Sequence, residues 1–548
     1  MKDAAPVMKL HQLLAESLIR MGVTRLFGLV GDANLFLVDA YRRNGQGRYI
    51  ACTHEANAVL AAIGAAQVTG RTGVATVTHG PALTNVMTAL TEAAKGGIPL
   101  VVLCGDTAPG DTQHLQKIDQ REVVAASGAL FVEMHGPDTA IDDLARAFRL
   151  AAHHRKPVVF NMRIDLQWQD VRPRGIPMEM QAVRMAAASG ELLEEAVGML
   201  ASARRPLILA GRGAVSARAR EAILQLARRI EAPLATTLKA QGLFSGEPFD
   251  LGICGGLSHP TATDQIAGSD CILAFGASLS KHTTEMGAYT KDKRIIQILP
   301  DMQETPRLDV PSIRLFGDLP ATAEAIIELL DMAEIPASGA TTEDLASRIA
   351  DEARAAGQDL PFAAMAPGTV DFAPALRRLG KALPDRRVLV ADLGRFVTTA
   401  WRHLPVSCPS DLVYTSHFGG IGCGMGQAVG AAASVSDRPT VLVVGDGGFL
   451  LSGLSELSVV RREKLDLIII VCNDGSYGAE HVQFTNRNMP PDLSMIDPPD
   501  FAAVAQAMGL WSLRVTDRDQ LEAACLAIRE RRGPVLIDLR LDPAKIEM

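Results

Sequence analysis

The chain has 548 residues, too many for one hydrophobic core, so we expect about three or four domains. Its 48% hydrophobic and 21% charged residues are typical of globular proteins and exclude extended disorder. The net charge of -8 argues against nucleic acid or an anionic membrane surface as a partner. The eight cysteines form no Cys-x-x-Cys pair. With no signal peptide and no membrane-spanning apolar run, we expect a cytoplasmic protein.

The first region, to about residue 166, alternates short apolar strands with helical stretches, which is typical of a doubly wound α/β domain. His54 and Glu55 follow the second of its strands, and Glu55 precedes a predicted helix rich in small residues. Ligands bind at the carboxyl ends of parallel strands, so this glutamate is a candidate site residue. The alternative is a glutamate that only stabilises the helix dipole. Strands are predicted at residues 25–30, 49–53, 74–78, 99–103 and 157–161, and helices at 56–68 and 85–94.

Two further α/β regions follow, separated by a helix-containing linker at residues 332–369. We therefore predict three doubly wound α/β domains with mainly parallel sheets, and the first and last are candidates for related folds. Their predicted bounds are 1–170, 190–335 and 370–548. Strands are predicted at 206–210, 271–275 and 294–298 in the second region, and at 388–391, 441–444, 467–471 and 534–538 in the third.

The most informative pattern lies in the third region. An apolar strand ends in Gly445-Asp446-Gly447-Gly448, an amphipathic run follows, and a second strand ends at Asn473. This is one βαβ unit with a carboxylate and a carboxamide at the carboxyl ends of neighbouring strands. Backbone N–H groups suit a diphosphate, and Asp and Asn oxygens suit Mg²⁺. A plain βα turn is the alternative.

Two distant motifs together resemble thiamine diphosphate-dependent enzymes. The Gly-Asp-Gly…Asn spacing is one. The other consists of His54-Glu55, Thr78–Asn85 and Ile98–Val102, which look like the pyrimidine-binding domain of the acetolactate synthase and 2-oxo acid decarboxylase group, including benzoylformate decarboxylase-like enzymes. The resemblance covers the whole chain and implies pyrimidine-binding, middle and diphosphate-binding domains, in that order.

The resemblance also implies roles for individual residues. Glu55 would hydrogen-bond N1′ of the aminopyrimidine and favour the imino tautomer, whose nitrogen deprotonates C2 of the thiazolium. Ile421, in a Gly-Gly-apolar-Gly loop, would hold the cofactor in its bent form, with Met425 as the competing candidate. The other implied cofactor contacts are Gly419 at the pyrimidine, Gly394, Arg395, Gly447 and Gly448 at the diphosphate, and Asp446, Asn473 and Gly475 at Mg²⁺.

Three residues of the first region are further catalytic candidates. His79 stands where acetolactate synthases usually have a small polar residue; it is a candidate acid/base or substrate-carboxylate ligand, with a structural helix cap as the alternative. His114 and Gln120 lie in a loop where pyruvate decarboxylases carry a histidine pair and acetolactate synthases a glutamine. Gln120 fits the second pattern better and indicates carboligation; a solvated loop is the alternative.

Acetolactate synthases also bind FAD in the middle domain. The turns at 211–213, 236–238 and 276–278 are comparable, but residues 278–282 lack the expected Arg-Phe-Asp-Asp type of sequence, so FAD is doubtful here. We therefore expect a thiamine diphosphate- and Mg²⁺-dependent enzyme that decarboxylates a 2-oxo acid and transfers the product to a second carbonyl. A simple decarboxylase, an acyl-CoA-type lyase and a non-catalytic homologue are the alternatives. The resemblance implies a homodimer or homotetramer with Glu55 and Asp446 meeting across chains.

Overall fold

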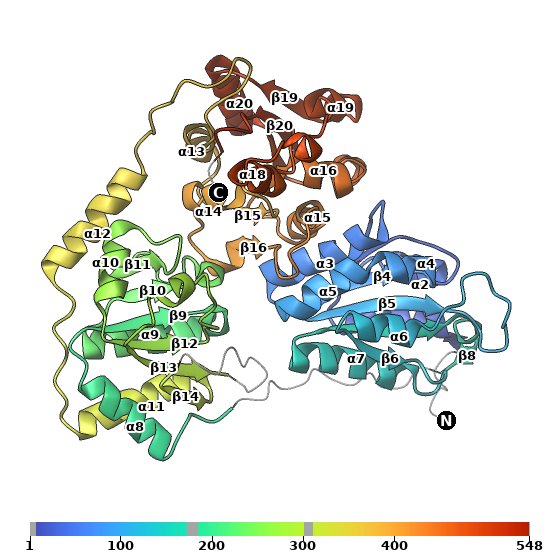
Figure 1. Ribbon diagram of the computed structural model, residues 1–548. Helices are drawn as coiled ribbons and strands as arrows, with labels where there is room; N and C mark the ends of the chain where they lie inside the picture. Colours follow the sequence, from blue (N-terminus) through green and yellow to red (C-terminus); the bar gives the residue numbers. More distant parts are fainter. Residues whose placement is uncertain (1–6, 173–184, 301–310, 547–548) are drawn as a thin grey trace. The chain divides into compact units, whose positions relative to one another are not determined.

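A computed structural model describes residues 7–172, 185–300 and 311–546. They form three six-stranded sheets whose paired strands are parallel, and a small antiparallel pair of β1 (Met8–Lys9) with β8 (Asp170–Val171). Figure 1 shows the helices and strands. The chain divides into two compact units. One holds residues 1–180, 360–404 and 413–548, and the other residues 181–359 and 405–412.

The first sheet has the order β3-β2-β4-β5-β7-β6. Its strand β5 is buried on both faces: Leu100 and Val102 pack into one core, and Val101 and Leu103 into the other. This explains why the strand is a continuous apolar run. The strands are β2 (Arg25–Gly28), β3 (Arg48–Ala51), β4 (Gly73–Val77), β5 (Leu100–Asp106), β6 (Leu130–Glu133) and β7 (Pro157–Arg163). The helices are α1 (Leu10–Arg20), α2 (Leu35–Arg43), α3 (Glu55–Thr69), α4 (Pro81–Asn85), α5 (Met87–Gly96), α6 (Gln120–Ala126) and α7 (Ala140–His154).

The last sheet has the order β16-β15-β17-β18-β20-β19. Numbered within its own region, this is the same strand order as in the first sheet, which supports the expected relation of the two folds. The strands are β15 (Val388–Ala391), β16 (Leu412–Tyr414), β17 (Thr440–Gly445), β18 (Leu467–Asn473), β19 (Trp511–Val515) and β20 (Val535–Arg540). The helices are α13 (Phe372–Ala382), α14 (Val397–His403), α15 (Gly424–Ser434), α16 (Asp446–Ser452), α17 (Leu457–Glu463), α18 (Gly478–Asn486), α19 (Phe501–Ala507) and α20 (Arg518–Glu530).

The middle sheet has the order β11-β10-β9-β12-β13-β14, which is the strand order of dinucleotide-binding folds. The predicted linker carries one helix, α12. The strands are β9 (Pro206–Ala210), β10 (Leu234–Thr236), β11 (Asp250–Ile253), β12 (Cys271–Phe275), β13 (Arg294–Leu299) and β14 (Ile313–Phe316). The helices are α8 (Glu191–Ala201), α9 (Ala217–Ile230), α10 (Pro260–Gly268), α11 (Leu319–Met332) and α12 (Glu343–Ala356). The α/β class with three parallel sheets is thus confirmed, whereas the domain bounds stay predictions.

Helices α3 and α15 join the first and last sheets within the first unit, and their residues share one hydrophobic core. The helices cross at glycines. A Cβ on Gly64 would lie 2.0 Å from the carbonyl oxygen of Gln427, and one on Gly430 would lie 1.8 Å from that of Ala61. Neither contact leaves space for a side chain, so these glycines allow the backbones to approach.

The crossing gives a first prediction. Gly430→Ala forces α3 and α15 apart, so we expect a loss of about 1–3 kcal/mol in the free energy of unfolding, measured by urea denaturation. Gly198→Ala is the matched control, because Gly198 also lies inside a helix but has no neighbour within 4 Å of a Cβ. That variant should gain up to about 1 kcal/mol. An unchanged midpoint for Gly430→Ala would refute this packing.

Candidate active site

The order of the strands in the first and last sheets indicates where the candidate site lies. In the first sheet the chain runs from β2 to β3 on one side and then crosses to β4 on the other side of β2. Ligands of open parallel sheets bind where this reversal occurs, at the carboxyl ends of the two central strands. Asp32 and His79 follow β2 and β4 closely. In the last sheet the same position lies between β15 and β17, which are followed by Asp392 and Asp446.

Asp446 is a buried carboxylate surrounded by donors. It is 3% exposed and accepts hydrogen bonds from the backbone N–H groups of Gly447 at 2.8 Å and Gly475 at 2.6 Å. Burial and the neighbouring Asp474 carboxylate raise the pKa of Asp446 to about 7. A buried carboxylate beside a second one is costly without a compensating cation.

Asn473 completes the arrangement expected of a cation site. Its Nδ2 donates to the buried Asp538 carboxylate at 2.8 Å, which turns Oδ1 the other way. Among the described residues, Oδ1 has no hydrogen-bond partner although it is fully buried. An oxygen donor without a partner on the strand next to Asp446 suits a hard cation, so these residues fit the predicted Mg²⁺. The Gly475 carbonyl already accepts the N–H of Ile496 at 2.8 Å, and a carbonyl has a second lone pair.

The structure modifies the prediction for the diphosphate residues. The Arg395 guanidinium is 3% exposed and is paired with the Asp474 carboxylate at 2.7 Å. Its side chain therefore holds the loop after β18, which leaves the diphosphate contact of Arg395 and Gly394 as a prediction. The glycines of the Gly-Asp-Gly-Gly turn have packing reasons as well. A Cβ on Gly447 would lie 2.7 Å from the Tyr477 ring, and one on Gly448 would lie 2.6 Å from the Asp392 carboxylate.

Two buried carboxylates hold the loop that carries Gly419 and Ile421. Asp392 accepts the N–H groups of Gly422 at 2.8 Å and Gly424 at 3.2 Å, and burial raises its pKa to about 6. Gly419 has a φ of +84°, which only glycine adopts readily. Ile421 is half-buried.

The second carboxylate belongs to Glu92 on α5. It is fully buried and accepts the backbone N–H groups of His417 at 2.9 Å and Phe418 at 2.6 Å. Its Oε1 also lies 2.7 Å from Nδ1 of the His417 ring. The competing residue Met425 is 1% exposed and belongs to the α3–α15 core. Core packing therefore accounts for Met425 and supports Ile421 as the apolar residue of the site.

Glu55 is the first residue of α3, where it is half-buried and accepts the Asn85 side-chain N–H at 3.0 Å. The residues on either side contact the last domain of the same chain. The Thr53 N–H donates to the Glu456 carboxylate at 2.9 Å, and Asn57 donates to the Ser452 carbonyl at 3.0 Å. Since Ser452 ends the helix that Asp446 begins, the structure brings the two motif regions together.

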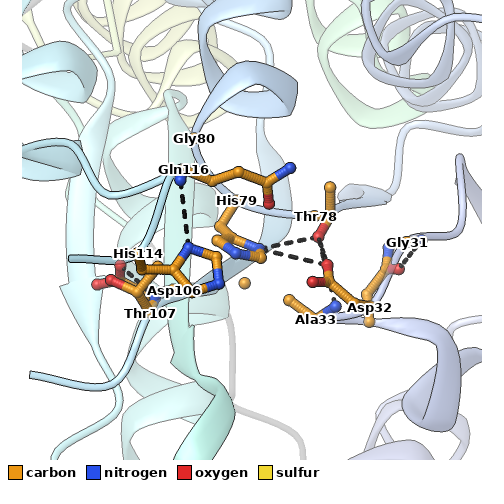
Figure 2. Close-up of polar contacts among 12 residues, drawn as sticks. Gly31, Asp32, Ala33, Thr78, His79, Gly80, Asp106, Thr107, His114 and Gln116 are labelled. Carbon is orange, nitrogen blue, oxygen red and sulfur yellow. Dashed lines mark hydrogen bonds and ion pairs between the residues drawn. The ribbon is translucent and has the colours of Figure 1, made fainter. Parts of the chain in front are cut away.

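His79 and His114 lie together beside Asp32 (Figure 2). Their ring centroids are 5.0 Å apart, and one carboxylate oxygen of Asp32 is 3.7 Å from Nδ1 of His79. His79 is 1% exposed. Burial lowers its pKa, as does the His114 charge, while the carboxylates of Asp32 and Asp106 oppose the change. Asp32 was not predicted from the sequence. It follows the first strand of the sheet, but this position becomes informative only when the order of the strands in the sheet is known.

Gln120 begins α6 and is 3% exposed. Its Nε2 donates to the carbonyl of Gly105 at 2.8 Å and to Asn161 Oδ1 at 2.6 Å, and its Oε1 accepts the N–H of Gly80 at 3.0 Å. The carboxamide therefore holds the turn after β4 against β5 and β7. These are the contacts that the Gln120 side chain makes in the structure. Contact of Gln120 with a substrate stays a prediction.

A cavity of about 650 Å³ opens beside His114 and Gln120. Its wall includes the charged side chains of Lys117, Arg121 and Glu133. Arg121 is paired with Glu133 at 3.2 Å and lies over the Phe131 ring. The cavity is large enough for a small organic ligand.

The glycines considered for FAD have another explanation. A Cβ on Gly211 would lie 2.3 Å from the carbonyl oxygen of Gly276, whose φ is +56°. Gly213 donates its N–H to the same carbonyl at 3.0 Å. The turns after β9 and β12 thus require glycine for their own packing, and the expectation on FAD stays a prediction.

Three family models of thiamine pyrophosphate enzymes, in which thiamine pyrophosphate is a synonym of thiamine diphosphate, match the chain in order. The N-terminal TPP binding domain matches residues 8–123, the central domain residues 193–326 and the C-terminal TPP binding domain residues 392–539. These ranges contain Glu55, His79, Asp446 and Asn473. In the described residues, no helix has the length and apolar character needed to cross a membrane.

Similar proteins include several enzymes. The chain is 28% identical to the acetolactate synthase isozyme 2 large subunit of Escherichia coli, over 97% of this chain and 95% of the relative. It is 28% identical to a probable 2-ketoarginine decarboxylase of Pseudomonas aeruginosa, over 96% of this chain and 93% of the relative. It is 26% identical to a sulfoacetaldehyde acetyltransferase of Castellaniella defragrans, over 92% of this chain and 88% of the relative.

Proposed function

The chain belongs to the thiamine diphosphate-dependent enzymes, and we propose that it decarboxylates a 2-oxo acid and transfers the remaining group to a second carbonyl compound. The observation that carries this proposal is the position of Asp446 and of the Asn473 side-chain oxygen at the carboxyl ends of the neighbouring strands β17 and β18, in the same unit as Glu55. Among the described residues, that oxygen has no hydrogen-bond partner. The relatives named above include a synthase, a decarboxylase and an acetyltransferase.

In the proposal, Asp446, Asn473 and Gly475 would hold Mg²⁺, a cation suited to oxygen ligands and to a diphosphate. Thiamine diphosphate, when bound, would supply the electron sink that decarboxylation of a 2-oxo acid needs. Glu55 holds a proton at the aminopyrimidine, and Asn85 orients the Glu55 carboxylate. Ile421 would support the bent form of the cofactor. It lies in a loop that Asp392 and Glu92 hold in place.

Substrate screening tests the proposal. Enzyme loaded with thiamine diphosphate and Mg²⁺ is given 2-oxo acids of different side chains, alone and with acceptor aldehydes or 2-oxo acids, while CO₂ and products are followed. We expect CO₂ release from at least one 2-oxo acid and a carboligation product when the acceptor is present. CO₂ with a free aldehyde as the sole product would indicate a simple decarboxylase. Cofactor binding without turnover of any 2-oxo acid would refute the proposed reaction.

The proposal includes a homo-oligomer with shared sites, as the family resemblance implies. In the single chain, Thr53 and Asn57 contact the last domain through Glu456 and Ser452. The same contacts can form when the last domain comes from a second chain, because the residues of the middle unit separate the two domains in sequence.

Mixing two inactive variants distinguishes shared sites from sites within one chain. Glu55→Gln and Asp446→Ala are unfolded together and refolded, or coexpressed. If sites are shared, a mixed dimer has one site with both substitutions and one intact site. Random pairing then restores about a quarter of wild-type activity. If each site lies within one chain, every site carries a substitution and activity stays at the level of the separate variants, which would refute the shared arrangement.

A further inference from the structure

The hydrogen bonds around His79 determine which ring nitrogen carries the proton. Thr78 Oγ1 lies 3.0 Å from Asp32 Oδ1 and 3.0 Å from Nδ1 of His79. The hydroxyl has one proton, and an ionised carboxylate can only accept. If the Thr78 proton went to His79, two oxygen lone pairs would face each other between Thr78 and Asp32. The hydroxyl therefore donates to Asp32 and accepts the Nδ1–H of His79. Figure 2 marks the two contacts as dashed lines.

With the proton on Nδ1, the lone pair of His79 is on Nε2. This atom is buried and has no hydrogen-bond partner among the described residues. The backbone after His79 is held as well, since the Gln120 carboxamide accepts the N–H of the next residue, Gly80. The structure thus presents a fixed, unsatisfied acceptor at the edge of the first sheet where ligands bind.

His114 has the opposite tautomer. The backbone N–H of Gln116 can only donate, and it lies 3.2 Å from Nδ1 of His114. In the neutral ring Nδ1 is then the acceptor, so the proton is on Nε2. Beside the His79 acceptor there is consequently an N–H donor.

We propose that Thr78 and Asp32 are positioning residues that keep the His79 proton on Nδ1, so that His79 Nε2 accepts a proton from an O–H group in the active site. The O–H bond breaks, the proton bonds to Nε2 and the oxygen keeps the electron pair. The Nδ1–H then bonds more strongly to the Thr78–Asp32 pair, which stabilises the imidazolium. The assignment deepens the proposed function and rests on it for the identity of the ligand.

The Nδ1–H tautomer also distinguishes between the two functions considered for His79, which are acid/base catalysis and binding of a substrate carboxylate. A carboxylate has no proton to donate to the Nε2 lone pair, so a neutral His79 repels it. The Nε2–H of His114 is the donor suited to a carboxylate. Of the two functions, the structure favours the acid/base one for His79.

A metal is the alternative occupant, because Asp32, His79 and His114 each offer a ligand atom within 4.8 Å of the other two. Two histidines and a carboxylate are a common ligand set. The Gln116 N–H counts against it, since Nδ1 of His114 is already an acceptor and Nε2 must lose its proton to bind a metal.

Nuclear magnetic resonance of ¹⁵N-histidine-labelled protein tests the proposal without needing turnover. The His79 signals, assigned by comparison with His79→Gln, should show the Nδ1–H tautomer in the wild type. Asp32→Asn can donate to Thr78 and should shift His79 toward the Nε2–H tautomer. Thr78→Val should do the same, and Thr78→Ser should restore the wild-type tautomer. Asp39→Asn, an exposed carboxylate on α2 paired with Arg43, is the control and should change nothing.

The pKa of His79 gives a second, signed readout. The facing charged groups are Asp32, Asp106 and His114. Removing a negative charge disfavours the imidazolium, so Asp32→Asn should lower the His79 pKa. The acid limb of the kcat/KM profile should move to lower pH in the same variant.

A wild-type Nε2–H tautomer, or a His79 tautomer that Asp32→Asn and Thr78→Val leave unchanged, would overturn the proposal. Saturable Co²⁺ binding that His114→Gln abolishes would overturn it in favour of a metal site. These outcomes are independent of whether thiamine diphosphate binds, so they are distinguishable from a failure of the proposed function.

Discussion

Replacing Glu55 with glutamine is expected to leave thiamine diphosphate and Mg²⁺ binding nearly intact and to lower kcat by about 10²–10⁴-fold. The reason is that glutamine can contact the aminopyrimidine but has no carboxyl proton to share with it. The side chain sits at the start of α3 with Asn85 as its partner, so the substitution changes little in the packing. The measurement is steady-state turnover of a 2-oxo acid, combined with cofactor titration of the same variant.

The control addresses the possibility that Glu55 only stabilises its helix. Glu191 is also the first residue of a helix, α8, and it is exposed. Glu191→Gln removes the same interaction with a helix dipole, which is worth about 0.3–1 kcal/mol, and should leave kcat unchanged. A Glu55→Gln variant as active as Glu191→Gln would refute the activating function of Glu55.

Asp446→Asn is expected to weaken Mg²⁺-dependent cofactor binding by at least about 100-fold, more than the loss of a residue that only orients a metal ligand. The buried Asp446 carboxylate provides the negative charge, and Asn473 contributes a neutral oxygen. Calorimetric titration with thiamine diphosphate at fixed Mg²⁺ measures the loss.

Asp466→Asn is the matched control, because Asp466 precedes β18 at its other end, where it is paired with Arg531. The Asp466→Asn variant should bind thiamine diphosphate with the same affinity as the wild type. Equal affinities for Asp446→Asn and the wild type would mean that the cofactor is bound elsewhere.

Much of the fold was predictable because the central strands are long apolar runs. The predicted strand at 467–471 lies within β18, and the predicted strand at 99–103 begins one residue before β5. Both strands are buried on both faces. The three-residue strands β10 and β16 were missed since they are too short to show a period. The edge strand β19 was missed because its residues do not alternate regularly between exposed and buried positions. The amphipathic run after Asp446 was read as one helix and forms two, α16 and α17.

The site was predictable where a residue lies at or shortly after the carboxyl end of a predicted strand, as with Asp446, Asn473, Glu55 and His79. Partners far away in the sequence were not predictable. The pairing of the Arg395 side chain with Asp474 is one such contact, and the diphosphate contact of Arg395 stays a prediction.

Residues that hold the site from another domain were missed for the same reason. Glu92 has no local signal on α5, and its function depends on the backbone of residues 417–418. Asp32 follows a strand as Glu55 does, but only the sheet order shows that it lies beside His79.

The most direct test of the account is calorimetric titration of the wild-type protein with thiamine diphosphate, with and without Mg²⁺. The Asp446–Asn473 pair and the family membership predict saturable binding that requires a divalent cation, with one cofactor per chain. Absence of binding in the presence of Mg²⁺, or equal binding after chelation of all divalent cations, would contradict the account.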